Sequence, residues 1–149
     1  MTDLWLAITH HIAIVALFGV FVAEFVSFKP GLDAAALRRL GRIDGLYGLL
    51  ALLVIVVGVL RLVHGAKGWD FYAANPWFWA KMAAFAIMGA ASAPPTLAVL
   101  RWRRENRADS TQLPGEQEIR RLRRFFHVEA LALGLMPLFA AAMARYGAF

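Results

Sequence analysis

The chain has 149 residues, of which 60% are hydrophobic and 17% are charged, and its mean hydropathy is +0.58. Soluble domains carry about a quarter charged residues and about half apolar ones, so this composition is typical of a membrane protein. It excludes an intrinsically disordered chain. The absence of cysteine excludes a disulfide scaffold, thiolate metal sites and a cysteine nucleophile.

Four segments are long and apolar enough to cross a bilayer as helices, which takes about 20 residues each. They cover residues 4–27, 44–64, 76–100 and 125–146. Regular alternation of polar and apolar residues, the mark of a membrane β-barrel, is absent from the sequence. We therefore expect an all-α integral membrane four-helix bundle that forms one domain over residues 1–149, with the first segment retained as a span.

Capping and turn residues predict where these helices begin and end. Lys-Pro-Gly at residues 29–31 ends the first helix. Asp33 is a suitable N-cap for a second helix that starts before its membrane part. Asn75 precedes a proline at the first position of the third helix. Pro94 and Pro95 lie inside that helix and should kink it.

The net charge of +6 is concentrated in two connecting segments. Residues 28–43 carry four Lys and Arg, residues 101–124 carry eight, and the opposite side has four. The positive-inside rule then places both segments in the cytoplasm and both termini on the outer, periplasmic side of a bacterial inner membrane. The basic charge is thus explained by orientation and by anionic lipid, and no nucleic-acid partner is expected.

Basic and imidazole side chains gather at the outer ends of three predicted spans. Ionisable residues within a membrane are costly and mark functional sites. The members of this outer layer are His10, His11, Arg61, His64, Lys67 and Lys81, with Trp77 beside them. At a rise of 1.5 Å per residue, His10, Arg61 and Lys81 reach matching depths on three helices. The other tryptophans, including Trp102 on the inner side, are expected at the membrane interfaces.

A second, inner layer combines acidic and polar side chains. Its members are Glu24, Asp44, Tyr47, His127 and Glu129. On the second span, Asp44, Tyr47 and Arg61 form one polar stripe that is expected to connect both layers. Two roles are open for the three acids. They could relay protons, or they could form ion pairs with flanking arginines, which is the more usual role of such groups. The arginines in question are Arg38, Arg42, Arg123 and Arg124.

Several motifs together resemble an uncharacterised bacterial family of small predicted membrane proteins, over nearly the whole chain. These motifs are the His10-His11 pair, the run Arg-Leu-Gly-Arg-Ile-Asp-Gly-Leu-Tyr-Gly at 39–48, Asn-Pro-Trp-Phe-Trp-Ala-Lys at 75–81 and Pro-Pro-Thr at 94–96. The resemblance implies a common four-helix bundle.

More distantly, the chain resembles the membrane-bound, haem-associated protoporphyrinogen oxidase and the copper-resistance D-type membrane proteins. His10 matches their first-helix histidine, Arg61 the basic residue of the second helix and Lys81 the lysine of the third. This resemblance implies a haem pocket. The oxidase motif Arg-x-Phe-Asn-Glu is matched only loosely, because residues 124–129 read Arg-Phe-Phe-His-Val-Glu, so protoporphyrinogen oxidation is not assigned.

The leading functional expectation is that haem b or a related tetrapyrrole binds between the first three spans and has a redox role. His10 would be the axial ligand, and the second position would fall to His11, His64 or Lys81. Both His10 and His64 are therefore candidate metal ligands. Arg61 and Lys67 would pair with the propionates, and Trp77 would form a wall of the pocket.

Two alternatives remain open at this point. One is a non-catalytic structural or accessory subunit of a larger membrane complex. The other is handling of copper or another metal, since His and Met suit copper and carboxylates suit harder ions. The expected partners are the lipid bilayer and, beyond it, other membrane subunits or a redox partner. In the haem reading, Glu24, Asp44 and Glu129 would relay protons from the inner side.

Overall fold

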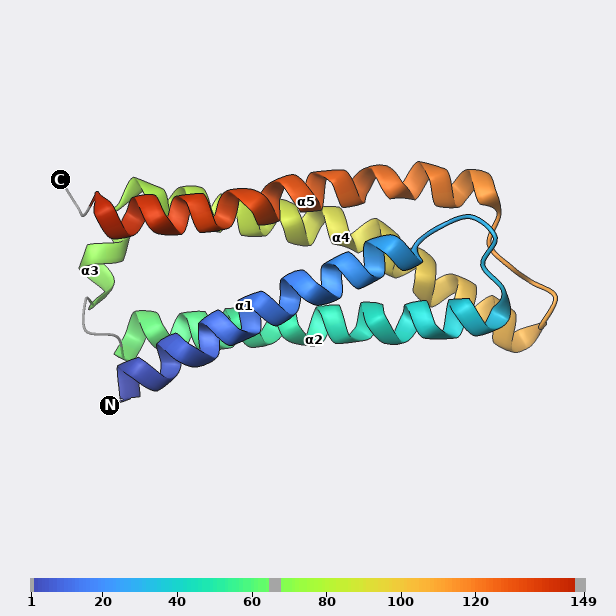
Figure 1. Cartoon of the computed structure of the whole chain (residues 1–149), viewed down its shortest axis with the longest axis horizontal. Helices are drawn as coiled ribbons and strands as arrows, with labels where there is room; N and C mark the ends of the chain where they lie inside the picture. Colours follow the sequence, from blue (N-terminus) through green and yellow to red (C-terminus); the bar gives the residue numbers. More distant parts are fainter. Residues whose placement is uncertain (1, 65–67, 147–149) are drawn as a thin grey trace.

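The structure, a computed structural model, describes residues 2–64 and 68–146. Over these residues the chain forms five helices and no strand (Figure 1). The helices are α1 (Thr2–Ser27), α2 (Ala34–His64), α3 (Gly68–Ala73), α4 (Pro76–Ala108) and α5 (Glu116–Arg145). The predicted all-α class is thereby confirmed for the described part of the chain.

The four long helices are each long and apolar enough to cross a membrane. The most apolar stretches have a mean hydropathy between 1.6 and 2.6, yet only 17% to 33% of each stretch is buried inside the bundle. Large apolar side chains such as Val15, Leu49 and Leu131 are more than 60% exposed. A surface this apolar is suited to lipid rather than to water.

The long helices form two antiparallel pairs, α1 with α2 and α4 with α5, which pack side by side (Figure 1). The start of α1, the end of α5 and the short α3 lie together at one end of the bundle, here called the terminal end. The connections at 28–33 and 109–115 lie at the opposite, loop end. The orientation of these two ends across the membrane stays a prediction.

The connection between α1 and α2 ends in the predicted N-cap. The backbone amide of Ala36 donates to Oδ1 of Asp33 at 2.6 Å, which satisfies one of the free amides of the first turn. Gly31 has a φ of +82°, a left-handed conformation that favours glycine. The sequence features at 29–33 therefore act as predicted.

Asn75 both caps α4 and ties it to the end of α5. Its Oδ1 accepts from the backbone amide of Trp77 at 3.0 Å. Its Nδ2 donates to the carbonyl oxygens of Met143 and Tyr146 at 3.4 and 3.3 Å. Asn75 is fully buried. Its side-chain amide would be costly to bury without hydrogen bonds, and the bonds that satisfy it also join α4 to the end of α5.

The helix α4 runs without interruption through Pro94 and Pro95. In Figure 1 its first half follows α5, and its second half slants toward the loop end of α2. This change of direction agrees with the predicted kink, because each proline removes a backbone hydrogen bond from the helix.

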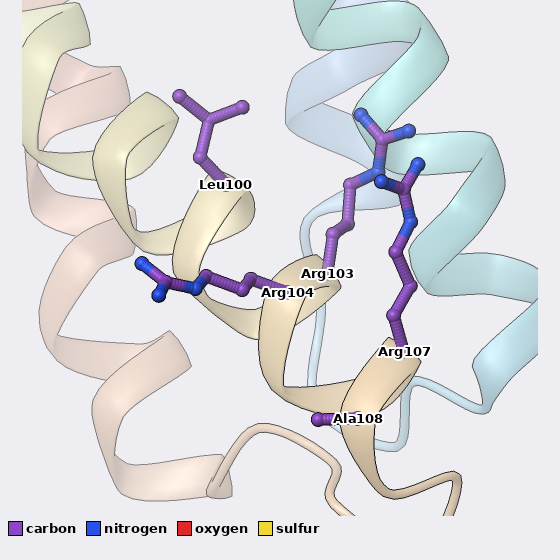
Figure 2. Close-up of a pocket in the computed structure, with 5 residues that line it drawn as sticks. All are labelled: Leu100, Arg103, Arg104, Arg107 and Ala108. Carbon is purple, nitrogen blue, oxygen red and sulfur yellow. The ribbon is translucent and has the colours of Figure 1, made fainter.

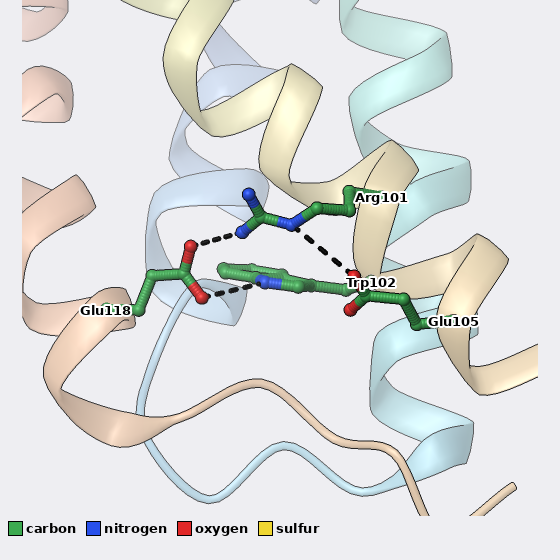
Figure 3. A network of polar contacts seen from close by, with 4 residues as sticks. All are labelled: Arg101, Trp102, Glu105 and Glu118. Atoms are coloured by element: carbon green, nitrogen blue, oxygen red, sulfur yellow. Dashed lines mark hydrogen bonds and ion pairs between the residues drawn. The ribbon is translucent and has the colours of Figure 1, made fainter. Parts of the chain in front are cut away.

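The loop end is packed around aromatic rings. The centre of the Phe28 ring lies 4.9 Å from the centre of the Phe126 ring and 5.7 Å from that of the Trp102 ring. The prediction that Trp102 is an interface residue is wrong, because its side chain is only 2% exposed. Its indole nitrogen donates to Glu118 at 3.1 Å, and the same carboxylate pairs with Arg101 (Figure 3). Because its indole N–H has a hydrogen-bond acceptor, the side chain of Trp102 can be buried without an unsatisfied polar group.

Candidate functional site

A cavity of about 340 Å³ lies in the terminal half of the bundle. All five helices contribute to its wall. The lining residues with polar or sulfur-containing side chains are His10, Arg61, Tyr72, Lys81, Met82 and Met143. The three basic groups that were predicted to share one depth, from α1, α2 and α4, therefore meet at one cavity.

His10 is a buried residue at the wall of this cavity. The residue is 7% exposed, and its Nδ1 atom is buried without a hydrogen-bond partner. Its ring lies against Gly58 of α2, where an added β-carbon would stand 3.3 Å from Cε1. An unpaired buried imidazole nitrogen is costly, so the arrangement favours a ligand or metal at His10.

Arg61 and Lys81 make the cavity electropositive. Both lie close enough to His10 for their charges to act on its ring. The Nε atom of Arg61 is buried and, like Nδ1 of His10, lacks a partner among the described residues. The described lining contains no carboxylate. These features favour an anionic group in the cavity, with which a guanidinium makes strong hydrogen bonds.

The remaining wall is apolar and reaches the lipid-facing surface. Its described apolar members are Ile14, Val54, Ile55, Gly58, Val59, Leu62, Phe78 and Phe85. Ile55 and Val59 are 46% and 51% exposed, so the cavity communicates with the outer side of α2. A ligand for this site would combine an apolar body with an anionic group.

Three of the other predicted site residues lie away from the described lining of the cavity. The ring N–H of His11 donates to the carbonyl of Ala7 at 2.6 Å, and the side chain is exposed. His64 is likewise exposed and bonds to a carbonyl of its own helix. Trp77 stacks against Phe139, with ring centres 6.2 Å apart. The fourth, Lys67, is outside the described residues.

Five side chains at the cavity were not singled out as site residues from the sequence. They are Tyr72, Phe78, Met82, Phe85 and Met143. Phe78 and Phe85 stand three and four residues from Lys81, so helical spacing alone places them on its face. Tyr72 and Met143 come from α3 and α5, and their approach depends on tertiary packing.

The inner layer forms a separate buried cluster nearer the loop end. Glu24, Asp44 and Glu129 come from α1, α2 and α5 and are 3%, 5% and 1% exposed. Glu24 lies within hydrogen-bonding reach of Asp44. The structure thus brings all three predicted carboxyl groups into the interior of the bundle.

Hydroxyl groups bind two of these carboxyl groups. Tyr47 donates to Oε1 of Glu129 at 3.2 Å, and Thr96 donates to Oδ1 of Asp44 at 2.6 Å. These bonds connect α2 to α5 and α4 to α2. Thr96 was not recognised as a member of the layer, although it follows the two prolines of α4. The acidic cluster therefore links the helix pairs through hydrogen bonds.

The expectation of ion pairs between these acids and flanking arginines is wrong for the described residues. Every ion pair there uses Arg101 or Arg120, with the exposed acids Glu105, Glu116 and Glu118. His127 is also separate, because it is exposed and its ring N–H donates to a carbonyl of its own helix. The described part of the chain has no group of three or more His, Cys, Asp or Glu placed to hold a metal ion.

The expected polar stripe between the two layers is interrupted. Residues 48–60 of α2 are all apolar, and Tyr47 and Arg61 are about 21 Å apart along the helix axis at 1.5 Å per residue. Buried Leu17, Val54 and Met88 fill the interior at this level. The cavity and the acidic cluster are therefore two separate polar sites with an apolar layer between them.

Comparison with known proteins gives a family match. The family model described as "Predicted membrane protein (DUF2214)" matches residues 2–147. No curated protein matches the chain, and no solved structure does. The resemblance to an uncharacterised membrane family is thus confirmed, whereas the more distant resemblance to protoporphyrinogen oxidase and copper-resistance D-type proteins receives no support from these comparisons.

Proposed function

The chain belongs to the DUF2214 family of predicted membrane proteins, and we propose that it binds haem b or a related tetrapyrrole in the cavity at the terminal end. The observation that carries this proposal is the imidazole ring of His10, which lines that cavity and whose buried Nδ1 atom has no hydrogen-bond partner. Imidazole is a common axial ligand of haem iron. The cavity volume of about 340 Å³ is at the lower end of the range for small-molecule sites, and its open side leaves part of the ligand against lipid.

The chain supplies partners for each part of such a ligand. Arg61 would pair with the propionates, and Phe78 and Phe85 would form an aromatic wall for an apolar macrocycle. Lys81 would either join Arg61 at the propionates or serve as the second axial ligand. Of the predicted second ligands, only Lys81 lines the described cavity, and Met82 and Met143 now join it as candidates. The ring of His10 would be held in place by its contact with Gly58.

A bound haem would give the protein one-electron redox chemistry. The apolar walls around His10 would limit the access of water. Glu24, Asp44 and Glu129 would take up protons from the loop end, which is predicted to face the cytoplasmic side of a bacterial inner membrane. Because an apolar layer separates this cluster from His10, transfer between the two sites would require water or movement of side chains. A redox partner or a neighbouring subunit would exchange the electron.

The test is an absorption spectrum of the detergent-purified protein, first oxidised in air and then reduced with dithionite. The expected result is a Soret band that shifts on reduction, at close to one haem per chain. A featureless visible spectrum from folded protein, expressed with ample haem, would contradict the proposal. That outcome would favour the alternative of an accessory subunit without a cofactor.

Copper binding is a second candidate, supported by the cavity itself. His10, Met82 and Met143 all line it, and imidazole with thioether sulfur suits copper, above all Cu(I). Elemental analysis of the same preparation separates the two readings. Copper in proportion to protein, together with no porphyrin absorbance, would replace the haem assignment with a copper site.

A further inference from the structure

A second pocket lies at the loop end, between the start of α2 and the last turns of α4. Its volume is about 460 Å³, and we call it the arginine pocket. It is lined by Ala34, Leu37, Arg38, Arg42, Arg103, Asn106, Arg107 and Ser110. Four guanidinium groups and no carboxylate are among these residues. The haem proposal does not involve this pocket, and its link to the acidic cluster is the charge of Arg103, which acts on Asp44.

The four arginines form two pairs of like charge. Arg38 and Arg42 are four residues apart on α2, and Arg103 and Arg107 are four residues apart on α4. Like charges at this spacing lie on one helix face and repel each other. In Figure 2 the side chains of Arg103 and Arg107 both extend toward α2, while Arg104 points the other way. The pocket therefore concentrates positive charge from two helices.

No ion pair among the described residues neutralises this charge. The nearest acids in the sequence are engaged elsewhere: Asp33 caps α2, and Glu105 pairs with Arg101. Asp44, two residues from Arg42, is close enough for the charge of Arg103 to act on it, but it accepts a hydrogen bond from Thr96 and forms no ion pair. Asp109 accepts two hydrogen bonds from Thr111, which lower the pKa of its carboxyl group. An external anion is thus the missing partner of the arginine pocket.

Arg103 fixes one side of the pocket. Its Nη1 atom donates to the carbonyl of Gly41 at 3.2 Å, and its side chain lies across that glycine so closely that a β-carbon at position 41 would overlap it. Gly45, about one turn further along the same helix, has no such neighbour. The guanidinium of Arg103 is therefore positioned by α2 itself.

An apolar flank continues from the arginines toward the middle of the membrane. The adjoining hollow of Figure 2 shares Arg103 and Arg107 with the arginine pocket and also includes Leu100. Leu100 is 51% exposed and stands about one helical turn from Arg103 toward the span. A phospholipid at a membrane surface would suit this arrangement, because its phosphate would lie beside the arginines and its acyl chain along Leu100.

We infer that the arginine pocket binds the phosphate group of an anionic phospholipid, whose acyl chain lies along Leu100. Guanidinium groups bind phosphate through paired hydrogen bonds, and basic pockets between membrane helices recognise lipid headgroups. A free phosphate ion has the same headgroup chemistry, but it would make no use of the apolar flank. This difference separates the two sources of the anion.

The experiment uses the full chain, purified and delipidated in a neutral detergent, with lipid binding measured by native mass spectrometry. The probes are phosphatidylglycerol, phosphatidylcholine with the same acyl chains, and inorganic phosphate. The test variant is Arg42→Gln with Arg107→Gln. The matched control is Arg39→Gln with Arg120→Gln, which removes the same charge at the same end but outside the described lining of the pocket.

The expected result is preferential binding of phosphatidylglycerol, weakened at least about tenfold in the test variant and little changed in the control. If the double variant does not fold, the single exposed Arg38→Gln should weaken binding about threefold. Equal weakening in test and control variants would overturn the inference, since charge density alone would then explain binding. Equal affinity for phosphatidylcholine, or displacement of the lipid by inorganic phosphate, would also overturn it.

Discussion

Gly58 of α2 leaves the space in which the ring of His10 lies. A β-carbon at position 58 would stand 3.3 Å from Cε1 of that ring, closer than a comfortable van der Waals contact between carbon atoms. Nδ1 of the same ring is buried without a partner at the cavity. The absence of a side chain at Gly58 therefore sets the position of the proposed ligand ring.

Substitution of Gly58 should impair cofactor binding. Gly58→Val adds a branched side chain against His10, so the ring must move and haem occupancy should fall at least about tenfold. The matched control is Gly48→Val on the same helix, because a β-carbon at Gly48 meets nothing within 4 Å. Haem per chain, measured from the absorbance of purified protein, checks this. Equal occupancy in both variants would contradict the role of Gly58.

Arg61 should strengthen binding of the anionic part of the ligand. Arg61→Gln would remove the proposed charge-assisted hydrogen bond to a propionate, worth about 1.5–3 kcal/mol, so the Kd for haem should rise at least about tenfold. Arg145→Gln, exposed at the same end of the bundle, serves as the charge-matched control. Haem titration of apoprotein in detergent gives both values. A Kd that changes equally in the two variants would assign Arg61 only a general electrostatic effect.

The acidic cluster should stabilise the bundle through the bond between Tyr47 and Glu129. Tyr47→Phe removes this donor to a buried carboxyl group, which should lower the free energy of unfolding by about 1 kcal/mol. Tyr146→Phe, at an exposed position, should have little effect. Reversible unfolding in mixed micelles measures the difference. An unchanged stability in Tyr47→Phe would show that the bond contributes nothing.

The loop end should face the cytoplasm, because it holds most of the basic residues. The chain has no cysteine, so single cysteines report topology without background. Ala35→Cys lies at the loop end and Ala74→Cys at the terminal end, both at exposed positions. A membrane-impermeant maleimide should label position 74 in intact bacterial cells and position 35 only after lysis. The reverse pattern would invert the predicted orientation.

The sequence predicts the helices well because their signals are local. The caps at Asp33 and Asn75 and the apolar spans each depend on a few neighbouring residues, and the structure contains them. Matching depth also predicts that His10, Arg61 and Lys81 gather, since depth follows from helix geometry alone. These three residues are the part of the cavity that was foreseen.

What the sequence does not predict depends on contacts between helices. Trp102 is a tryptophan at the end of a predicted span, where tryptophan is common at the membrane interface. Its packing against Phe28 and its hydrogen bond to Glu118 nevertheless bury it. Thr96 and Met143 enter their sites only because α4 and α5 approach α2 at particular heights. Local patterns carry no information about such approaches, so these residues required the fold.

His10 is the proposed ligand of a tetrapyrrole in the cavity at the terminal end. The most direct measurement compares reduced-minus-oxidised absorption spectra of His10→Ala and His11→Ala with that of the unmodified protein. His11 is the matched control, because it is adjacent but exposed and bonded to a backbone carbonyl. His10→Ala should lose or shift the haem bands, while His11→Ala should retain them. Unchanged bands in His10→Ala would contradict this ligand assignment.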